Sequence, residues 1–255
     1  FELAKDKVLM GAERRSIVMP ENERMNTAYH ESGHTVVAKV LSEYTDPVHK
    51  VTIIPRGRAL GVTMQLPEED RYSHNREYLL ARIAVLMGGR IAEEIFMEQM
   101  TTGAANDFEH STDLAQKMVQ RWGMSDSLGP RVFGDNESEV FMGRDLVTHR
   151  NLSNATAEEV DKEVSRIIAE QYDRARSIIE ENRHIIETMA KNLLEWETLE
   201  SDQIDQIMAG DEPRPPAPSS DDDPPITGSD AESGGAASPK PEINPNIDLP
   251  AGHSA

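Results

Sequence analysis

Two histidines stand four residues apart in the stretch TAYHESGHTVV (residues 27–37), which otherwise reads as an apolar helical run. An α-helix turns once in about 3.6 residues, so residues i and i+4 lie on one face, one above the other. The imidazoles of His30 and His34 can therefore converge on a single ion. Glu31 follows His30 directly, which turns its carboxylate aside from that point. Such a polar trio would be costly in an apolar helix unless it had partners.

The pattern H-E-x-x-H is typical of thermolysin-like zinc peptidases, in which neutral imidazoles bind the metal and the glutamate acts as general base. As a bare pattern it also arises by chance, in helices whose histidines cap, pack or face solvent. Gly33, inside the same run, costs about 1 kcal/mol of helix propensity relative to alanine. We expect it to make room for another backbone or for a substrate.

A catalytic zinc needs a third protein ligand and an open position for water. The extended pattern H-E-x-x-H-x-x-G-x-x-H fails, because Val37 and Val40 stand three and six positions after His34. Two carboxylates remain as candidates: Glu93 in GGRIAEEIF and Asp107 in TTGAANDFEHSTDLAQ. Neither is excluded, although an aspartate in the first turn of a helix is short and well fixed, which favours Asp107.

The composition narrows both the chemistry and the partners. The chain has no cysteine, so any transition metal must be held by histidine, aspartate or glutamate. Its 26 basic and 46 acidic residues give a formal net charge of −20, which disfavours nucleic acid as a partner. No apolar run approaches the roughly 20 residues that cross a bilayer, and no secretory signal opens the chain. We expect the chain as given to be soluble.

The hydrophobic pattern predicts a mainly α fold with a small β-sheet beside the histidine-bearing helix. Helices are expected at about residues 2–15, 21–41, 75–97 with an interruption at Gly88-Gly89, 106–122, 154–192 and 201–208. Two β-branched runs, HKVTIIP and LGVTMQLP, predict a pair of short strands around the turn Arg56-Gly57-Arg58. Residues 127–144 are expected to form a loop or loose hairpin, and the apolar stripe of 154–192 to pack on the chain's own helices.

The end of the chain differs in composition from the rest. Residues 211–255 contain ten of the fifteen prolines, few aliphatic residues, and nine acidic against two basic side chains. Such a segment cannot bury enough apolar surface to offset its ordering entropy. We expect this tail to be disordered.

Six blocks of the sequence, in one order and spacing, carry a family resemblance: FELAKDKVLMGAERRS, TAYHESGH, DPVHKVTIIPRGRALGVTMQLPEED, GGRIAEEIF, TTGAANDF and RWGMSDSLGP. Together they closely resemble the peptidase portion of the FtsH family, the membrane-anchored AAA+ zinc proteases of bacteria and of mitochondrial and plastid membranes. The resemblance covers about residues 1–209. It suggests the end of an AAA+ module or linker helix at 1–16, a zinc peptidase domain at 17–210 and the acidic tail at 211–255.

The resemblance implies a role for each site residue. One Zn²⁺ per chain would be held by His30, His34 and Asp107, with Glu31 as the catalytic glutamate. Glu93 would then support a ligand without binding the metal. The strand from about Ala59 to Met64 resembles the family's active-site edge strand, where an extended polypeptide binds by strand addition. The expected substrate-binding residues are Ala59, Leu60, Gly61, Val62, Thr63 and Met64.

The implied activity is ATP-dependent, processive cleavage of unfolded or tagged membrane and cytosolic proteins by a homo-hexameric ring, with the helix at 154–192 contributing ring contacts. The chain contains no G-x-x-x-x-G-K-[ST] phosphate loop, so ATP and Mg²⁺ are expected to bind only elsewhere in a longer protein. Because the chain begins at Phe1 in what reads as a helix, we expect it to be a piece of such a protein. The longer protein would lie on the cytoplasmic side of the bacterial inner membrane, anchored through segments absent here.

Two other functions compete with this interpretation. A catalytically silent ring scaffold or docking module would keep the fold and lose the chemistry, but all four positions that the chemistry needs are intact. A soluble, stand-alone thermolysin-like peptidase would explain the histidine pair. It would not explain the third ligand or the helix with which the chain begins.

Overall fold

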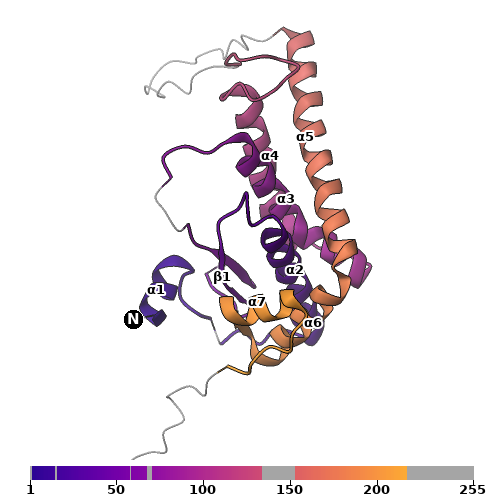
Figure 1. Cartoon of the computed structure of the whole chain (residues 1–255). Helices are drawn as coiled ribbons and strands as arrows, with labels where there is room; N and C mark the ends of the chain where they lie inside the picture. The colour runs from indigo at the N-terminus through magenta and orange to yellow at the C-terminus, as the bar shows by residue number, and fades with distance from the viewer. Residues whose placement is uncertain (1, 15, 58, 68–70, 134–152, 217–255) are drawn as a thin grey trace, which may run out of the picture. The chain divides into compact units, whose positions relative to one another are not determined.

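The structure, a computed structural model, describes residues 2–14, 16–57, 59–67, 71–133 and 153–216. Its elements in chain order are α1 (Glu2–Leu9), α2 (Glu21–Val40), β1 (Val48–Thr52), β2 (Val62–Gln65), α3 (Arg76–Ala92), the π-helical turn η1 (Glu93–Met97), the 3-10 turn η2 (Thr102–Ala104), α4 (Ala105–Gln120), α5 (Asn154–Glu181), α6 (Arg183–Trp196), β3 (Thr198–Glu200) and α7 (Ser201–Ala209) (Figure 1). The prediction of a mainly α fold with a small sheet is confirmed. Among the described residues, no helix combines the length and hydropathy that a membrane span requires.

The core lies where α2 and α3 pack on one another and on the later helices. α3 also contacts α4 and α5, while α2 contacts α6, and the long α5 runs beside α3 and α4 (Figure 1). All but one member of the apolar stripe that the sequence predicted are buried on α5 and α6: Val160, Val164, Ile167, Ala175, Ile178, Ile179, Ile185, Ile186, Met189 and Leu193. The remaining member, Ile168, is partly buried against the same core. The expectation that this stripe packs on the chain's own helices is confirmed.

Three predicted helix boundaries are wrong. The expected single helix at 154–192 is two helices, α5 and α6, divided at Asn182, whose side-chain Nδ2 donates to the Ile178 carbonyl at 2.7 Å and so competes with the helix ladder. The first helix ends at Leu9 instead of continuing to residue 15, because Gly11 adopts a left-handed φ of +86°. Gly88 and Gly89 do not interrupt their helix, since α3 runs through both.

The sheet has the strand order β2-β1-β3, and both pairings are antiparallel. The predicted hairpin is confirmed, with Val51 of β1 opposite Thr63 of β2. β3 was not predicted; its three residues pair with the far side of β1. The strand expected from Ala59 begins only at Val62, and Ala59 instead forms an isolated bridge with Arg56 across the turn.

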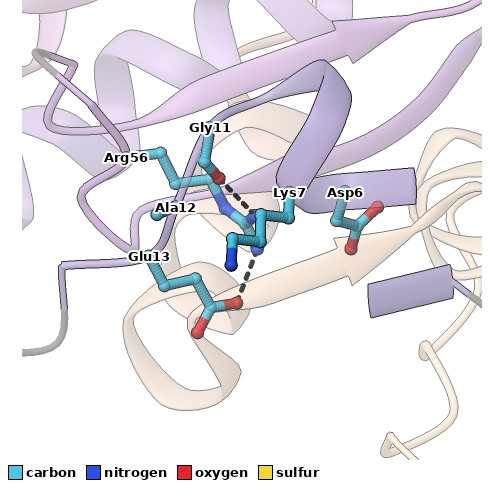
Figure 2. A pocket seen from close by; sticks show the side chains of 6 residues that line it. All are labelled: Asp6, Lys7, Gly11, Ala12, Glu13 and Arg56. Atoms are coloured by element: carbon cyan, nitrogen blue, oxygen red, sulfur yellow. Dashed lines mark hydrogen bonds and ion pairs between the residues drawn. The ribbon is translucent and has the colours of Figure 1, made fainter. Parts of the chain in front are cut away.

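Arg56 connects the N-terminal segment to the hairpin. Its Nη2 donates to Glu13 Oε1 at 2.6 Å and its Nη1 to the Gly11 carbonyl at 3.4 Å (Figure 2). These residues border a cavity of about 290 Å³ that is also lined by Asp6, Lys7 and Ala12. Arg56 and Asp6 already have charged partners there, because Asp6 Oδ2 accepts from Lys50 Nζ at 2.7 Å. The histidine pair lines a different cavity.

The predicted loop at 127–144 and the predicted tail lie largely outside the described residues. Only 127–133 of the loop and 211–216 of the tail are described. This short part of the tail folds back on α7, since Gln203 Nε2 donates to the Arg214 carbonyl at 2.7 Å and Arg214 N donates to Gln206 Oε1 at 2.8 Å.

Glu163 ties α5 to the segment that follows α4. Its Oε1 accepts from Ser125 Oγ at 2.9 Å and from Arg166 Nη2 at 2.8 Å, and its Oε2 accepts from Arg166 Nε at 2.9 Å. These hydrogen bonds from Arg166, which outweigh the effect of burial, lower the pKa of the Glu163 carboxyl to about 2. The ionised form of this side chain therefore stabilises the fold.

Replacing Glu163 with glutamine should lower the free energy of unfolding by about 1–2 kcal/mol at pH 7. The effect is no larger because Arg166 is partly exposed, and solvent weakens its interaction with Glu163. A depressed carboxyl pKa contributes stability that is complete above the unfolded value of about 4.3 and is lost as the pH falls toward the folded value. The deficit of the variant should therefore shrink between about pH 4.5 and 2. Urea unfolding at several pH values measures it. Glu170→Gln, which removes an exposed partner of Arg166, is the control and should change stability by less than about 0.5 kcal/mol. An equal deficit at all pH values would contradict the assignment.

Candidate metal centre

α2 and α3 cross with their backbones in contact at a pair of glycines. A Cβ on Gly33 would stand 2.3 Å from the Gly88 carbonyl oxygen, and a Cβ on Gly88 would stand 2.7 Å from the Gly33 oxygen. Either methyl group would push the helices apart. The expectation that Gly33 makes room for another backbone is confirmed, and that backbone belongs to α3.

The crossing brings three ligand atoms together. His30 Nε2 lies 3.0 Å from His34 Nε2, and Asp107 Oδ2 lies 3.3 Å from the first and 3.5 Å from the second. Within the described ranges, these three residues form the group of histidine and acidic side chains whose ligand atoms approach closely enough to share a metal ion. Four-coordinate zinc with bonds of about 2.0–2.2 Å separates its ligand atoms by about 3.3–3.5 Å. The two sides at Asp107 match one face of such a tetrahedron, and the side between the histidines is about 0.3 Å shorter.

The second nitrogen of each histidine determines which way its lone pair points. His30 Nδ1 lies 2.8 Å from Glu93 Oε1, and His34 Nδ1 lies 2.7 Å from the Val85 carbonyl oxygen. Both neighbours are acceptors, so in the neutral imidazoles the Nδ1 atoms carry the hydrogens and the Nε2 lone pairs face each other and Asp107. Three converging acceptor atoms repel one another unless a cation lies between them. The donor set therefore fits a divalent metal.

Asp107 reaches this point from the first turn of α4. Its carboxylate lies near the positive end of the helix dipole, which favours the charged form. The turn before α4 is fixed by Arg90 of α3, whose Nη2 donates to the Thr101 carbonyl at 2.6 Å and whose guanidinium stacks over Phe108. The long-range contact between α3 and α4 thus delivers the aspartate to the histidines.

Glu93 faces the outer nitrogen of His30 and does not join the three ligand atoms. The side chain is fully buried, and Oε2 also accepts from Thr101 N at 3.0 Å while Thr101 Oγ1 donates to the same carboxylate. Both oxygens of this buried carboxylate therefore have a neighbour that can donate. Its contact with Nδ1 fixes the orientation of the His30 ring and leaves Nε2 facing His34 and Asp107.

The carboxylates dominate the electrostatics of the site. Burial lowers the pKa of His30, but hydrogen bonds to Asp107 and Glu93 and the charge of Glu31 more than offset it and raise the pKa to about 10. Burial also lowers the pKa of His34, and Asp107 raises it on balance. Burial raises the pKa of Asp107, but the two histidines lower it by a larger amount, so the pKa falls well below its usual value. The field of the site favours a cation, and a metal would compete with protons for it.

Glu31 lies beside the ligands with one carboxylate oxygen held. Thr63 Oγ1, on β2, donates to Glu31 Oε2 at 2.7 Å. A Cβ on Gly61 would come within 2.7 Å of Glu31 Oε1 and 2.8 Å of its Cγ, so the glutamate packs directly on this glycine. The sequence predicted that the Glu31 carboxylate turns away from the point where the two histidines converge. In the structure this carboxylate lies against β2.

The three converging side chains and β2 line a common cavity of about 840 Å³. Of the expected substrate-binding residues, Ala59, Leu60, Gly61, Val62 and Thr63 line it, as do His30, Glu31, His34, Glu93 and Asp107. Met64 is buried instead, and Gln65, which was not predicted, lines the cavity. Successive side chains of a strand point to opposite faces, so Gln65 faces the cavity while Met64 is buried on the other face.

Three contributors to the site were missed by sequence reasoning. Thr101 carries a recognisable signal, because its side chain accepts from Gly103 N at 3.1 Å and caps the turn before α4. Gly89 could have been noticed as the second glycine of a pair inside a helix. The carbonyl of Val85 has no signal in the sequence, since every residue has one.

The chain is similar in sequence to known proteins over most of its length. The family model described as Peptidase family M41 matches residues 17–207. An ATP-dependent zinc metalloprotease FtsH of Magnetococcus marinus is 54% identical over 211 residues, which cover 83% of this chain and 31% of that protein. Its namesake in Cupriavidus metallidurans is 55% identical over 216 residues, covering 85% and 33%. That of Caulobacter vibrioides is 50% identical over 216 residues, covering 84% and 34%. The chain spans about a third of the length of these curated relatives.

Gly89 is expected to be essential for metal binding and dispensable for folding. A Cβ there would lie 2.5 Å from His30 Cε1 and 2.6 Å from the Nε2 atoms of both histidines. Gly89→Ala should therefore abolish stoichiometric Zn²⁺ binding, while its helix propensity favours α3 by about 1 kcal/mol. Metal analysis after gel filtration and thermal unfolding of the metal-free chain measure the two effects.

The adjacent glycine provides the contrast. Gly88→Ala meets the backbone of Gly33 and should destabilise the fold by about 1–3 kcal/mol. Full zinc occupancy in Gly89→Ala, or an equal loss of stability in both variants, would contradict this division of roles.

Proposed function

The chain belongs to peptidase family M41, and on that basis we propose that it is a zinc metalloendopeptidase domain that hydrolyses internal peptide bonds of polypeptide substrates. One observation carries the proposal: the Nε2 atoms of His30 and His34 and Oδ2 of Asp107 form a triangle of 3.0–3.5 Å sides, next to a glutamate. We assign these three residues as the ligands of one Zn²⁺ and Glu31 as the catalytic residue.

The set of donors supports zinc over harder or softer metals. Two imidazoles and one carboxylate suit Zn²⁺, whereas Ca²⁺ and Mg²⁺ prefer all-oxygen sites, and the chain has no cysteine. Three protein ligands leave the open position that a catalytic zinc needs. When bound, zinc would acidify a water molecule and polarise the scissile carbonyl.

Glu31 would act as general base and then as general acid. Its carboxylate accepts the proton of the attacking water and later delivers it to the leaving amine. The carboxylate borders the same cavity as the ligands, and its Oε1 lies on the side not held by Thr63. These contacts support Glu31 as the group that moves this proton.

Glu93 and the Val85 carbonyl would fix the two histidine ligands. Their contacts to the Nδ1 atoms keep each imidazole in the tautomer that offers Nε2 to the metal. We propose Glu93 as a positioning residue, in agreement with the role expected from the sequence.

The substrate would bind along β2. This strand lies at the edge of the sheet, lines the cavity and pairs only with β1 within the described sheet. A polypeptide could add to it as a further strand, with backbone hydrogen bonds supplying affinity that depends little on sequence. Residues 59–64 are the proposed contact segment, with Met64 contributing through its backbone.

The relatives are named ATP-dependent, and each is about three times as long as the stretch matched here. We propose that ATP and Mg²⁺ act elsewhere in a longer protein, which would be a homo-hexamer held at the cytoplasmic side of the inner membrane. Its substrates would be unfolded or tagged membrane and cytosolic proteins. The excess of acidic residues supports the expectation that nucleic acid is not a partner.

Replacing Glu31 with glutamine should separate metal binding from catalysis. The variant should keep its Zn²⁺ and cleave an unstructured fluorogenic peptide at least about 100-fold more slowly, because a general base contributes about 10²–10⁴ in rate. Glu23→Gln, at the rim of the same cavity and on the same helix, is the matched control and should retain the rate within about threefold. Undiminished cleavage by Glu31→Gln would refute its catalytic role, and zinc-loaded wild type with no cleavage at all would favour the silent scaffold.

Replacing Asp107 with alanine should release the metal. Loss of a group that merely orients a ligand costs about 10–100-fold in affinity, so loss of a ligand should cost more than about 100-fold. Zinc competition with a chromophoric chelator measures the change, and circular dichroism checks the helices. Asp113→Ala, on the exposed side of the same helix, serves as control. Wild-type zinc affinity in Asp107→Ala would leave the third ligand unassigned and contradict the proposal.

A further inference from the structure

A chain of three side chains leads from the interior of α2 to the carboxylate of Glu31. Thr63 Oγ1 lies 2.7 Å from Glu31 Oε2 and 3.3 Å from the Glu31 carbonyl oxygen. Thr35 Oγ1, fully buried one turn further along α2, lies 3.4 Å from Thr63 Oγ1. The metal-ligand pattern in the sequence gives no reason for either hydroxyl.

The chemistry of the groups fixes the direction of these hydrogen bonds. An ionised carboxylate only accepts, so the single hydroxyl hydrogen of Thr63 must point to Glu31. The oxygen of Thr63 is then left as an acceptor, and Thr35 is the donor across the 3.4 Å contact. The hydroxyl hydrogen of Thr35 thus points to Thr63, and that of Thr63 points to the carboxylate. Hydrogen bonds aligned in this way polarise one another.

Gly61 restrains the same carboxylate from its other side. The ideal Cβ position of Gly61 lies 2.7 Å from Glu31 Oε1 and 2.8 Å from Thr27 Cγ2. The Glu31 carboxylate thus lies between the backbone of Gly61 and the hydroxyl of Thr63. The outer torsion of a glutamate is otherwise broad, so two contacts are needed to select one orientation.

We propose that Thr63 is a positioning residue for Glu31, holding Oε2 so that Oε1 is the oxygen that takes the proton from the attacking water. This inference rests on the proposed role of Glu31 as general base. Thr63 acts through Glu31 and does not itself exchange protons with the substrate. Misplacement of a catalytic group by about 1 Å can lower the rate about 100-fold, which is the scale of the effect that such a hydrogen bond can have.

The position of Thr63 on β2 gives the hydrogen bond a second consequence. Its side chain contacts α2, while the strand itself is the one proposed to pair with the substrate. Movement of the β2 edge would move the hydroxyl and with it the carboxylate. The base is therefore aligned only when the edge strand is in place to receive a polypeptide.

The test compares Thr63→Val, which removes the hydroxyl and keeps the shape, with Thr63→Ser, which keeps the hydroxyl. In the zinc-loaded protein, Thr63→Val should lower kcat for an unstructured peptide at least about tenfold and leave KM and zinc content within about twofold of wild type. Thr63→Ser should recover kcat to within about threefold. A purely structural threonine would not give this separation of kcat from KM.

A second threonine in the same sheet provides the matched control. Thr52 on β1 donates to the Glu197 carbonyl at 3.0 Å and lies 2.8 Å, oxygen to oxygen, from Thr198. Thr52→Val loses a buried hydroxyl without touching Glu31 and should keep kcat within about twofold. An equal fall of kcat in Thr52→Val, a rise of KM alone in Thr63→Val, or wild-type kinetics of Thr63→Val would each overturn the proposal. In the last case a Glu31→Gln variant that is still inactive would leave the proposed function standing.

A double-mutant cycle supplies a readout that does not depend on catalysis. Urea unfolding midpoints are measured for wild type, Thr63→Val, Glu31→Ala and the double variant, all zinc-loaded. Because the two side chains share a hydrogen bond, Thr63→Val should shift the midpoint clearly less in the Glu31→Ala background than in wild type. Equal shifts in the two backgrounds would show that the side chains are independent and would overturn the proposal.

Discussion

The contact between the backbones of Gly33 and Gly88 is the constraint on which the rest of the site depends. It sets how closely α2 approaches α3. The Val85 carbonyl reaches His34, and Gly89 leaves room for both imidazoles because the helices touch. A glycine pair inside two helices lowers helix propensity, and here the loss is offset by packing that no larger residue permits.

A second constraint is electrostatic. Glu31, Glu93 and Asp107 surround the two histidines, and burial would make so many carboxylates unfavourable without compensation. Glu93 is compensated locally by Thr101 and His30. Asp107 and the two Nε2 lone pairs share one region of space and can be compensated together by one divalent cation. Without a cation these atoms repel one another and the repulsion destabilises the fold. A bound metal would remove the repulsion, which couples metal binding to stability.

The features that the sequence predicted correctly are those set by local periodicity. The spacing of His30 and His34, the hairpin and the apolar stripe of α5 and α6 depend on about one turn of helix or two residues of strand. The residues favoured Asp107 over Glu93 as third ligand but excluded neither, because both are carboxylates on predicted helices. In the structure one faces a histidine Nδ1 and the other the Nε2 atoms, a difference set by packing between α3 and α4.

The wrong boundaries have the same origin. At Asn182 a side chain competes with the helix ladder although the apolar stripe continues unbroken, so periodicity alone joined α5 to α6. At Gly88-Gly89 the opposite error arose, since a pair of helix-breaking residues was kept helical by the partner helix. Propensity describes an isolated segment, and tertiary contacts decide the cases in which propensity and pattern disagree.

In the proposed function, the strand β2 would serve two parts of the reaction. The residue just before it, Gly61, has no Cβ to displace Glu31, while Thr63 on the strand donates a hydrogen bond to the same carboxylate. The backbone of the strand remains at the edge of the sheet, open to pairing. A peptide added there would extend the sheet and hold β2 more firmly, so binding energy gained far from the scissile bond would also fix the general base. Substrate recognition that is indifferent to side chains can in this way still improve catalysis, because the alignment depends on the backbone of the strand and not on the sequence bound to it.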